Sequence, residues 1–264
     1  MELSERKKLI LKAVVDTYVE KCEPVGSKYL ADYYNINLSP ATIRSTMNEL
    51  EQMGLLEQPH TSAGRIPSSL GYRVYVNNLM QSYKLTTVEI EQITENLNIK
   101  ISRLDKIIEQ AGKLISSMTA LMSVSTVLNN VLREINESQI YIDGAANLLN
   151  MPEYHDLERA KNLIKLLDNK NGITEIFSQS EKDRLNIYIG EENKITSSGD
   201  SSFIFKTFTL GDERLGAIGV MGPKRMDYSR IIAKLEYFAE SMAEIIKNET
   251  DESKFTQGGR SEHE

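Results

Sequence analysis

Apolar residues recur at helical spacing through the first part of the chain. The spacing predicts helices over residues 4–20, 27–34 and 40–53, with Ser27 as the cap of the second and Asn35 as its left-handed stop. Two short extended pieces then flank a turn at residues 61–64, and a further helix is expected over residues 69–80. Three helices followed by a hairpin predict a winged helix-turn-helix domain over residues 1–80.

The third predicted helix carries unusual side chains on its outer face. Ser39 is expected to cap the helix, Pro40 takes its first position and Gly54 ends it. Ile43, Met47 and Leu50 fall on one side and face a core. The opposite side bears small and hydrogen-bonding groups, and no acidic residue occurs between residues 36 and 48. Such a face is suited to close contact with another molecule.

The apolar pattern continues from residue 86 at steps of three and four. Thr86 and Glu89 form a capping-box pair, so one long helix is predicted over residues 86–122. Two arrangements fit this seam equally: contact with a second copy of the chain, or packing on its own domain. The predicted seam consists of Ile90, Ile93, Leu97, Ile101, Leu104, Ile108, Ala111, Ile115, Met118 and Met122.

Residues 123–249 alternate between strand-like and helix-like patterns. Strands are predicted at QIYID, RLNIYIG, SFIFKTFTL and RLGAIGVMG, with helices between residues 152 and 177 and a final amphipathic helix over residues 227–248. The tight turn at residues 211–212 indicates antiparallel pairing of the last two strands. The fold class is therefore α+β, and residues 250–264 are expected to form a disordered tail.

Charge and cysteine content indicate which partners and which cellular location the sequence allows. The chain of 264 residues has a formal charge of −7, but residues 1–80 hold nine basic and nine acidic residues, so the negative charge lies in the rest. A local positive surface is therefore compatible with an acidic protein. A single cysteine excludes an internal disulfide, and no secretion signal or long apolar run is present, so we expect a cytoplasmic protein.

Catalytic chemistry is weakly supported. Gly216, Gly219 and Gly222 lie in a strand and a turn, without the strand-to-helix setting that phosphate-binding glycines need. The three histidines are scattered, and none lies near Cys22 in sequence. We predict no enzyme activity, no cofactor and no metal site.

DNA recognition is favoured by three separate segments. Arg44 can bind guanine, Asn48 adenine, and the methyl groups of Ala41 and Thr42 can meet thymine in a major groove. Ser27 and Lys28 are expected to hold a phosphate, and the wing to contact the backbone or minor groove. The alternative is a winged helix that binds only protein. The predicted DNA-binding residues are Ser27, Lys28, Ser39, Ala41, Thr42, Arg44, Ser45, Asn48, His60, Thr61, Ser62, Arg65, Tyr72 and Arg73.

Several of these segments resemble one known family. LSPATIR, GLLEQPHTSAGRIPSSLGYRVYV, IYIDGAANLLNMPEYHDLE, IGEEN and GAIGVMGPKRMDYSRII are similar, in the same order, to motifs of the HrcA family of heat-inducible transcription repressors in bacteria. The resemblance implies a GAF-like second domain and a dimer that binds an inverted-repeat operator upstream of chaperone genes. It also implies modulation by the chaperonin GroEL. A ligand-sensing regulator of other genes is the alternative.

The chain departs from the family pattern in two places. The family often has Asn and an acidic residue after the arginine of the third helix, whereas this chain has Ser45 and Thr46. Only residues 123–139 connect Met122 to Ile140, where relatives carry a longer stretch with a dimerising insert. The resemblance therefore implies a shortened member with a reduced GAF-like domain, for which residues 86–122 are the candidate dimer seam.

Overall fold

The computed structural model describes residues 3–34, 36–97, 104–127, 140–181, 183–193, 199–210 and 213–258. The chain folds as two compact units. The N-terminal unit comprises Met1–Ser82, Ile189–Glu191 and Lys224–Ser229, and the C-terminal unit comprises Tyr83–Tyr188, Glu192–Pro223 and Arg230–Glu264.

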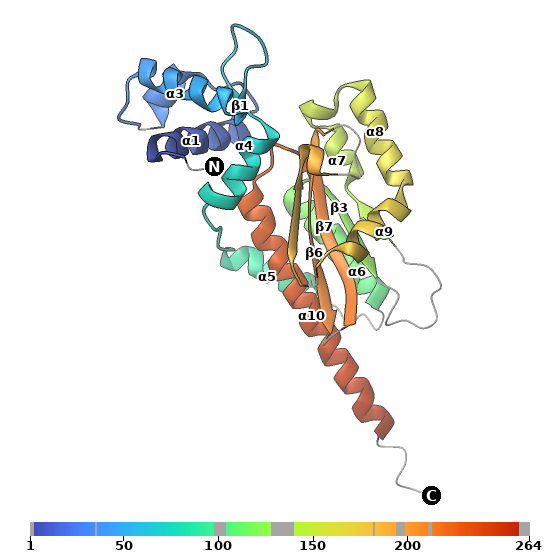
Figure 1. Ribbon diagram of the computed structural model, residues 1–264. Helices are drawn as coiled ribbons and strands as arrows, with labels where there is room; N and C mark the ends of the chain where they lie inside the picture. The colour runs from blue at the N-terminus through green and yellow to red at the C-terminus, as the bar shows by residue number, and fades with distance from the viewer. Residues whose placement is uncertain are drawn as a thin grey trace, which may run out of the picture. The chain divides into compact units, whose positions relative to one another are not determined.

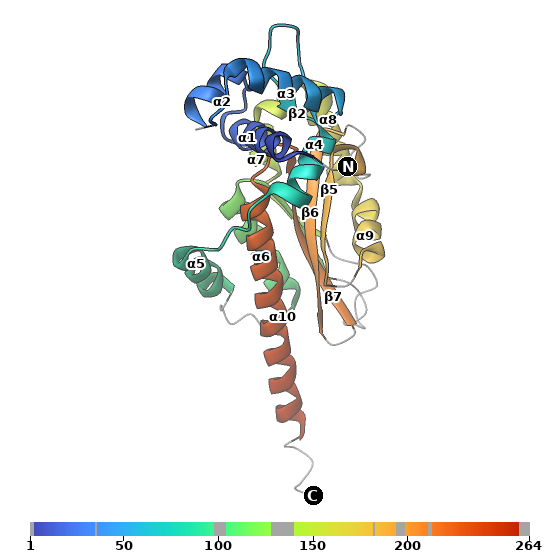
Figure 2. The same cartoon turned by 60° about the vertical axis from the view of Figure 1, so that its left-hand side comes forward.

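The N-terminal unit has the predicted order of three helices and a hairpin. Its helices are α1 (Glu5–Lys21), α2 (Ser27–Tyr33) and α3 (Pro40–Gln52), and the hairpin pairs β1 (Leu56–Glu57) with β2 (Ile66–Pro67) in antiparallel register. The loop between β1 and β2 extends away from these helices (Figure 2). A last helix follows as α4 (Ser69–Val74) and continues into the π-helical η1 (Tyr75–Leu79).

Local signals set the ends of α3 as predicted. The Ser39 side chain accepts the Thr42 N–H at 3.1 Å, and Gly54 has a φ of 72°, which favours glycine. The cap assigned to Ser27 is wrong, because Gly26 is the N-cap and Ser27 is the first residue of α2. The stop predicted at Asn35 lies outside the described residues.

Polar contacts also hold the N-terminal unit together beyond its apolar core. The carboxylate of Asp16 on α1 accepts hydrogen bonds from the hydroxyls of Tyr34 and Tyr75. Burial raises the pKa of both tyrosines, and the adjacent carboxylate raises it further. The segment Lys224–Ser229 packs here as well, since Arg225 Nη1 donates to the Val19 carbonyl oxygen at 3.3 Å.

The C-terminal unit contains a five-stranded sheet in the order β4-β3-β7-β6-β5, in which the pairs β4–β3, β3–β7 and β7–β6 are antiparallel. The strands are β3 (Met122–Val127), β4 (Ile140–Asp143), β5 (Leu185–Ile189), β6 (Ser201–Leu210) and β7 (Glu213–Pro223). The four predicted strands are confirmed, while the turn at residues 211–212 lies outside the described residues. Counted along the chain, the order is 2-1-5-4-3, in agreement with a GAF-like α+β domain.

The strand β3 was not predicted, and the helical region before it is shorter and more divided than predicted. The region contains α5 (Thr87–Leu97) and α6 (Leu104–Thr119), and Met122 begins a strand instead of ending a helix. Within this chain Ile93, Ile108 and Ile115 have no exposed surface, so this part of the seam packs on its own domain. Residues 98–103, including Ile101, lie outside the described part.

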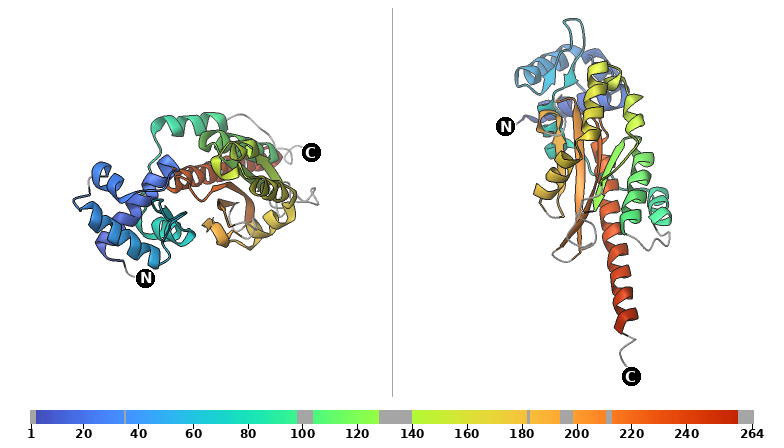
Figure 3. Two further views of the ribbon diagram at one scale, coloured as in Figure 1. Left: turned by 90° about the horizontal axis from the view of Figure 1, so that it is seen from above. Right: turned by 90° about the vertical axis from the view of Figure 1, so that its right-hand side faces the viewer.

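The register separates the sheet into two faces. Ser125, Ile218 and Lys206 share a row, and the Ser125 hydroxyl donates to the Ile108 carbonyl oxygen of α6 at 3.3 Å. Phe205 belongs to the other face, where its ring lies 4.8 Å from that of Phe177 in α9 (Lys170–Gln179). Helices therefore cover both faces of the sheet (Figure 3).

Shorter helices complete the C-terminal unit. Between β4 and β5 the chain forms α7 (Ala145–Leu149), which was not predicted, and the 3-10 turn η2 (Pro152–Tyr154). The helices α8 (Leu157–Asp168) and α9 follow and confirm the helical pattern predicted between residues 152 and 177. A further 3-10 turn, η3 (Gly190–Glu192), follows β5, and its first two residues belong to the N-terminal unit.

The final helix is longer than predicted. The helix α10 runs over Tyr228–Gly258 (Figure 1), whereas a disordered tail was predicted from residue 250. Residues 250–257 contain no proline or glycine, so nothing in the sequence ends the helix before Gly258. Among the described residues, no helix is long and apolar enough to cross a membrane.

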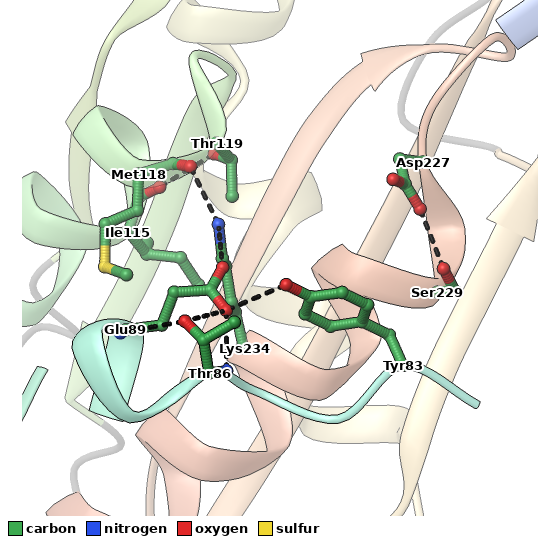
Figure 4. A network of polar contacts seen from close by, with 9 residues as sticks. All are labelled: Tyr83, Thr86, Glu89, Ile115, Met118, Thr119, Asp227, Ser229 and Lys234. Carbon is green, nitrogen blue, oxygen red and sulfur yellow. Dashed lines mark hydrogen bonds and ion pairs between the residues drawn. The ribbon is translucent and has the colours of Figure 1, made fainter. Parts of the chain in front are cut away.

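A buried lysine joins three helices of the C-terminal unit. Lys234 Nζ of α10 lies 3.3 Å from the Glu89 carboxylate of α5 and 3.0 Å from the Met118 carbonyl oxygen of α6 (Figure 4). Glu89 also accepts from the Thr86 N–H and the Tyr83 hydroxyl, which confirms the predicted capping box. Burial raises the pKa of Glu89, but the four donors together outweigh it and lower that pKa to about 2.

Candidate nucleic-acid interface

The outer face of α3 is exposed along its whole length. Ile43, Thr46, Met47 and Leu50 are buried against the core, as the helical spacing predicts. Pointing the other way, the exposed side chains are those of Ala41, Arg44, Ser45, Asn48 and Gln52. This surface combines small residues, which permit close approach, with the hydrogen-bonding groups that read base edges.

Thr46 does not belong to that surface. It is 1% exposed, and its hydroxyl donates to the Thr42 carbonyl oxygen. The departure from the family pattern therefore changes the exposed face at Ser45 alone. The hydroxyls of Ser39 and Thr42 are hydrogen-bonded to each other at 2.9 Å, beside the N-cap. Both side chains therefore help to stabilise the start of α3.

Among the described residues of α3, one charged side chain has no ionic partner, and it is a cation. Arg44 is exposed and has no ion pair or hydrogen bond there. Glu49 pairs with Lys7 of α1 at 3.0 Å, and Glu51 pairs with Arg65 at 2.8 Å. Both carboxylates are thus neutralised, which removes repulsion toward a phosphate backbone.

The tip of the wing is polar and held in shape by one side chain. His60, Thr61 and Ser62 are exposed. The amide of Gln58 donates to the carbonyl oxygens of Thr61 and Ala63 at 3.0 and 2.9 Å, which fixes the turn. Gln58 was not among the predicted residues, and only its position directly after β1, at the start of the hairpin loop, distinguishes it in the sequence.

The base of the wing is tied to the start of α2. Val25 and Arg65 exchange two backbone hydrogen bonds of 2.9 Å, which form an isolated antiparallel β-bridge beside the hairpin. Gly64 makes this approach possible, because a Cβ there would lie 2.3 Å from the Val25 carbonyl oxygen. A hollow of about 260 Å³ opens between α3 and the wing, with Ser27, Arg44 and Asn48 among its lining residues. Lys28, the residue after Ser27, is exposed.

Three predicted contact residues are buried or partly buried. Tyr72 is 1% exposed, and its ring packs 5.9 Å from that of Tyr228, so the predicted phosphate contact is wrong. Arg73, which follows Tyr72 on α4, is half-buried. Arg65 is 14% exposed and paired with α3 instead of facing outward.

Comparison with known proteins identifies the family. Residues 2–81 match the family described as "Winged helix-turn-helix transcription repressor, HrcA DNA-binding", and residues 71–232 match "HrcA protein C terminal domain". Similar proteins include the heat-inducible transcription repressors HrcA of Acetivibrio thermocellus and of Thermoanaerobacter sp. (strain X514). They are 32% and 31% identical, cover 94% of this chain, and are themselves covered over 97% and 98% of their lengths.

These alignments extend over 341 and 340 positions, more than the 264 residues of this chain, so the relatives contain segments without a counterpart here. The fold itself recurs in a crystal structure of a protein described only as hypothetical, with a TM-score of 0.79 at 18% identity. That match covers 94% of this chain and 100% of the other. The chain belongs to the HrcA family of winged-helix, DNA-binding transcription repressors.

Proposed function

We propose that this protein acts in the cytoplasm, without catalysis, as a repressor of chaperone genes that binds an inverted-repeat operator as a dimer. The observation that carries the proposal is the outer face of α3, where Arg44 is unpaired and Asn48 is exposed. In a two-fold dimer, two such helices enter successive major grooves about one helical turn, or a multiple of it, apart. Repression follows because the bound dimer occupies promoter DNA.

Phosphate contacts are assigned to the edges of this surface. Lys28 is exposed, and the wing tip presents His60, Thr61 and Ser62. Such contacts set the register of the protein on DNA, while base specificity comes from α3. Arg73 is half-buried and is assigned a lesser role.

Operator binding tests the proposal directly. We expect the purified protein to prefer a labelled inverted repeat from a chaperone promoter to a scrambled duplex by a factor of about a thousand or more at equal salt, measured by fluorescence anisotropy. Sedimentation velocity on the same sample should give a dimer. Equal, weak binding to both duplexes would instead favour a winged helix that contacts only protein, and a monomer that binds the repeat tightly would exclude the dimer.

We propose that the dimer forms through a surface other than the seam predicted from sequence. Most described seam residues, such as Ile93, Ile108 and Ile115, are buried within the chain and are not available to a second copy. Ile90 keeps 36% of its surface exposed, and Met118 is half-buried. We therefore assign dimerisation to a surface outside this seam.

The heat response is proposed to act through folding. Heating depletes the DNA-competent state, and a chaperonin that restores it raises the active fraction by mass action. The family resemblance identifies GroEL as this partner. Adding GroEL with ATP to the anisotropy assay should raise operator occupancy after heating, and unchanged occupancy at every temperature would remove this part of the proposal.

A second function, binding of a small zwitterionic ligand, is favoured by a cavity in the C-terminal unit. The cavity has a volume of about 320 Å³ and lies between α6, β3 and β4. Ser123 in its wall is 1% exposed, and its hydroxyl has no hydrogen-bond partner among the described residues. The Asp143 carboxylate and the Lys170 ammonium also line it without partners in that part of the chain, and their charges suit a free amino acid.

Thermal shift measurements test this second function. A panel of free amino acids should include one that raises the melting temperature of the wild type, because a ligand that binds only the native state stabilises it. The Asp143→Asn variant should lose that response and keep its melting temperature without ligand within a few degrees. No response to any amino acid, or an equal response in the variant, would contradict the ligand site.

A further inference from the structure

Arg65 lies where the wing meets α3, and its side chain is directed toward the helix. Its Nε donates to Glu51 Oε2 at 2.9 Å, and its Nη2 lies 2.8 Å from the same oxygen. Nη2 also donates to Asn48 Oδ1 at 2.9 Å. The planar guanidinium thus holds a carboxylate and an amide of one helix at the same time, which its fork of donors permits.

The start of this side chain is fixed as firmly as its end. The backbone of Arg65 is paired with Val25 through both its N–H and its carbonyl oxygen. Gly64, immediately before it, approaches Val25 too closely to accept a side chain. The Arg65 side chain therefore bridges the base of the wing and α3, and 14% of its surface is exposed to solvent.

This contact determines how Asn48 faces outward. A guanidinium has only donors, so the amide atom that meets it is the oxygen. The amide plane is then set, with the Nδ2 donors and the second lone pair of Oδ1 left for a ligand. Reading adenine requires this combination, because asparagine donates to N7 and accepts from the N6 amino group.

Arg65 is poorly suited to bind a DNA phosphate. Its charge is neutralised by Glu51, whose side chain is 34% exposed beside it. The wing residues that reach outward are His60, Thr61 and Ser62, beyond the hydrogen-bonded turn. A neutralised, largely buried cation adds little to counterion release.

We propose that Arg65 is a positioning residue that orients Asn48 for base recognition. The inference rests on the proposed function, in which α3 reads the operator. In this arrangement the wing contributes to base specificity indirectly, through the contact of Arg65 with Asn48. Glu51 holds the guanidinium in plane.

Three single variants test the proposal in the full-length protein. Each is compared by its operator preference, the ratio of affinities for the inverted repeat and a scrambled duplex, so a change in the folded fraction cancels. Asn48→Ala should lower the preference on the order of tenfold, as expected for one base contact. Arg65→Lys keeps the charge but loses the fork, and should lower it by as much as Arg65→Gln.

The double variant Asn48→Ala/Arg65→Lys should be no less selective than Asn48→Ala alone, since both changes remove the same contact. The salt dependence should be equal for Arg65→Gln and the wild type. A phosphate contact would instead leave Arg65→Lys with wild-type preference and flatten the salt slope of Arg65→Gln by about one unit. That result would overturn the inference.

The test separates the inference from the function on which it rests. If Asn48→Ala leaves operator preference unchanged, the assignment of base reading to this position fails and the inference fails with it. If Asn48→Ala lowers the preference and Arg65→Lys does not, the reading helix stands and only the positioning role of Arg65 is excluded.

Discussion

Replacement of Lys234 by Met is expected to lower the free energy of unfolding of the C-terminal unit by about 3 kcal/mol, since removing one partner of a buried ion pair leaves the other charge uncompensated. The methionine keeps the length of the apolar stem, but Glu89 loses its cation and the Met118 carbonyl oxygen its donor. Chemical denaturation followed by circular dichroism measures the change.

A matched lysine provides the control. Lys161 is exposed on α8, so Lys161→Met should change stability by less than about 0.5 kcal/mol. The double variant Lys234→Met/Glu89→Gln should regain part of the loss, because no unpaired charge then remains. A Lys234→Met protein as stable as the wild type would show that the three helices are held by apolar packing alone.

Acid should weaken the same network in the wild type. The folded-state pKa of Glu89 is about 2, below its ordinary value of 4.5, so its contribution is full above pH 4.5 and is lost as the pH falls toward 2. The stability difference between the wild type and Glu89→Gln should shrink over this interval. It should not change between pH 6 and 8.

Features fixed by neighbouring residues could be predicted from sequence. The ends of α3 depend on Ser39, Pro40 and Gly54, and the capping box depends on Thr86 and Glu89, which are three residues apart. The outer face of α3 followed from helical spacing. In each case the physical cause lies within one or two turns of the chain, where the sequence is directly informative.

Features that depend on contacts across the fold were predicted less well. The strand β3 reads MSVSTV, and its alternation was hidden by the helical spacing that precedes it. Tyr72 was predicted to contact DNA, whereas its ring packs against that of Tyr228, which lies far along the chain. The pairing of Arg65 with Glu51 joins the wing to a different element, and no local pattern specifies it.

The same difference between local and long-range contacts explains why the seam was predicted as a possible dimer contact. The spacing from Ile93 to Ile115 correctly indicated buried helix faces. It did not distinguish a second chain from the sheet of the same chain, because both present an apolar surface. The short connection between Met122 and Ile140 was identified from the family resemblance. The alignment with the relative from Acetivibrio thermocellus extends over 341 positions, more than the 264 residues of this chain.

The central claim is that the exposed face of α3 reads the operator, and Arg44 is its unpaired cation. Arg44→Ala should weaken operator binding by about 1 to 3 kcal/mol, because one bidentate contact to guanine is lost. Binding to scrambled DNA should change much less. Arg6 is an exposed arginine on α1, so Arg6→Ala controls for the loss of one positive charge.

The most direct measurement is fluorescence anisotropy of wild type, Arg44→Ala and Arg6→Ala on the inverted repeat, on scrambled DNA and on repeats substituted one base pair at a time. The account predicts that Arg44→Ala loses operator affinity and becomes indifferent to one base pair in each half-site, while Arg6→Ala keeps the wild-type pattern. Equal losses on operator and scrambled DNA, with every base preference intact, would contradict the claim that α3 reads the sequence.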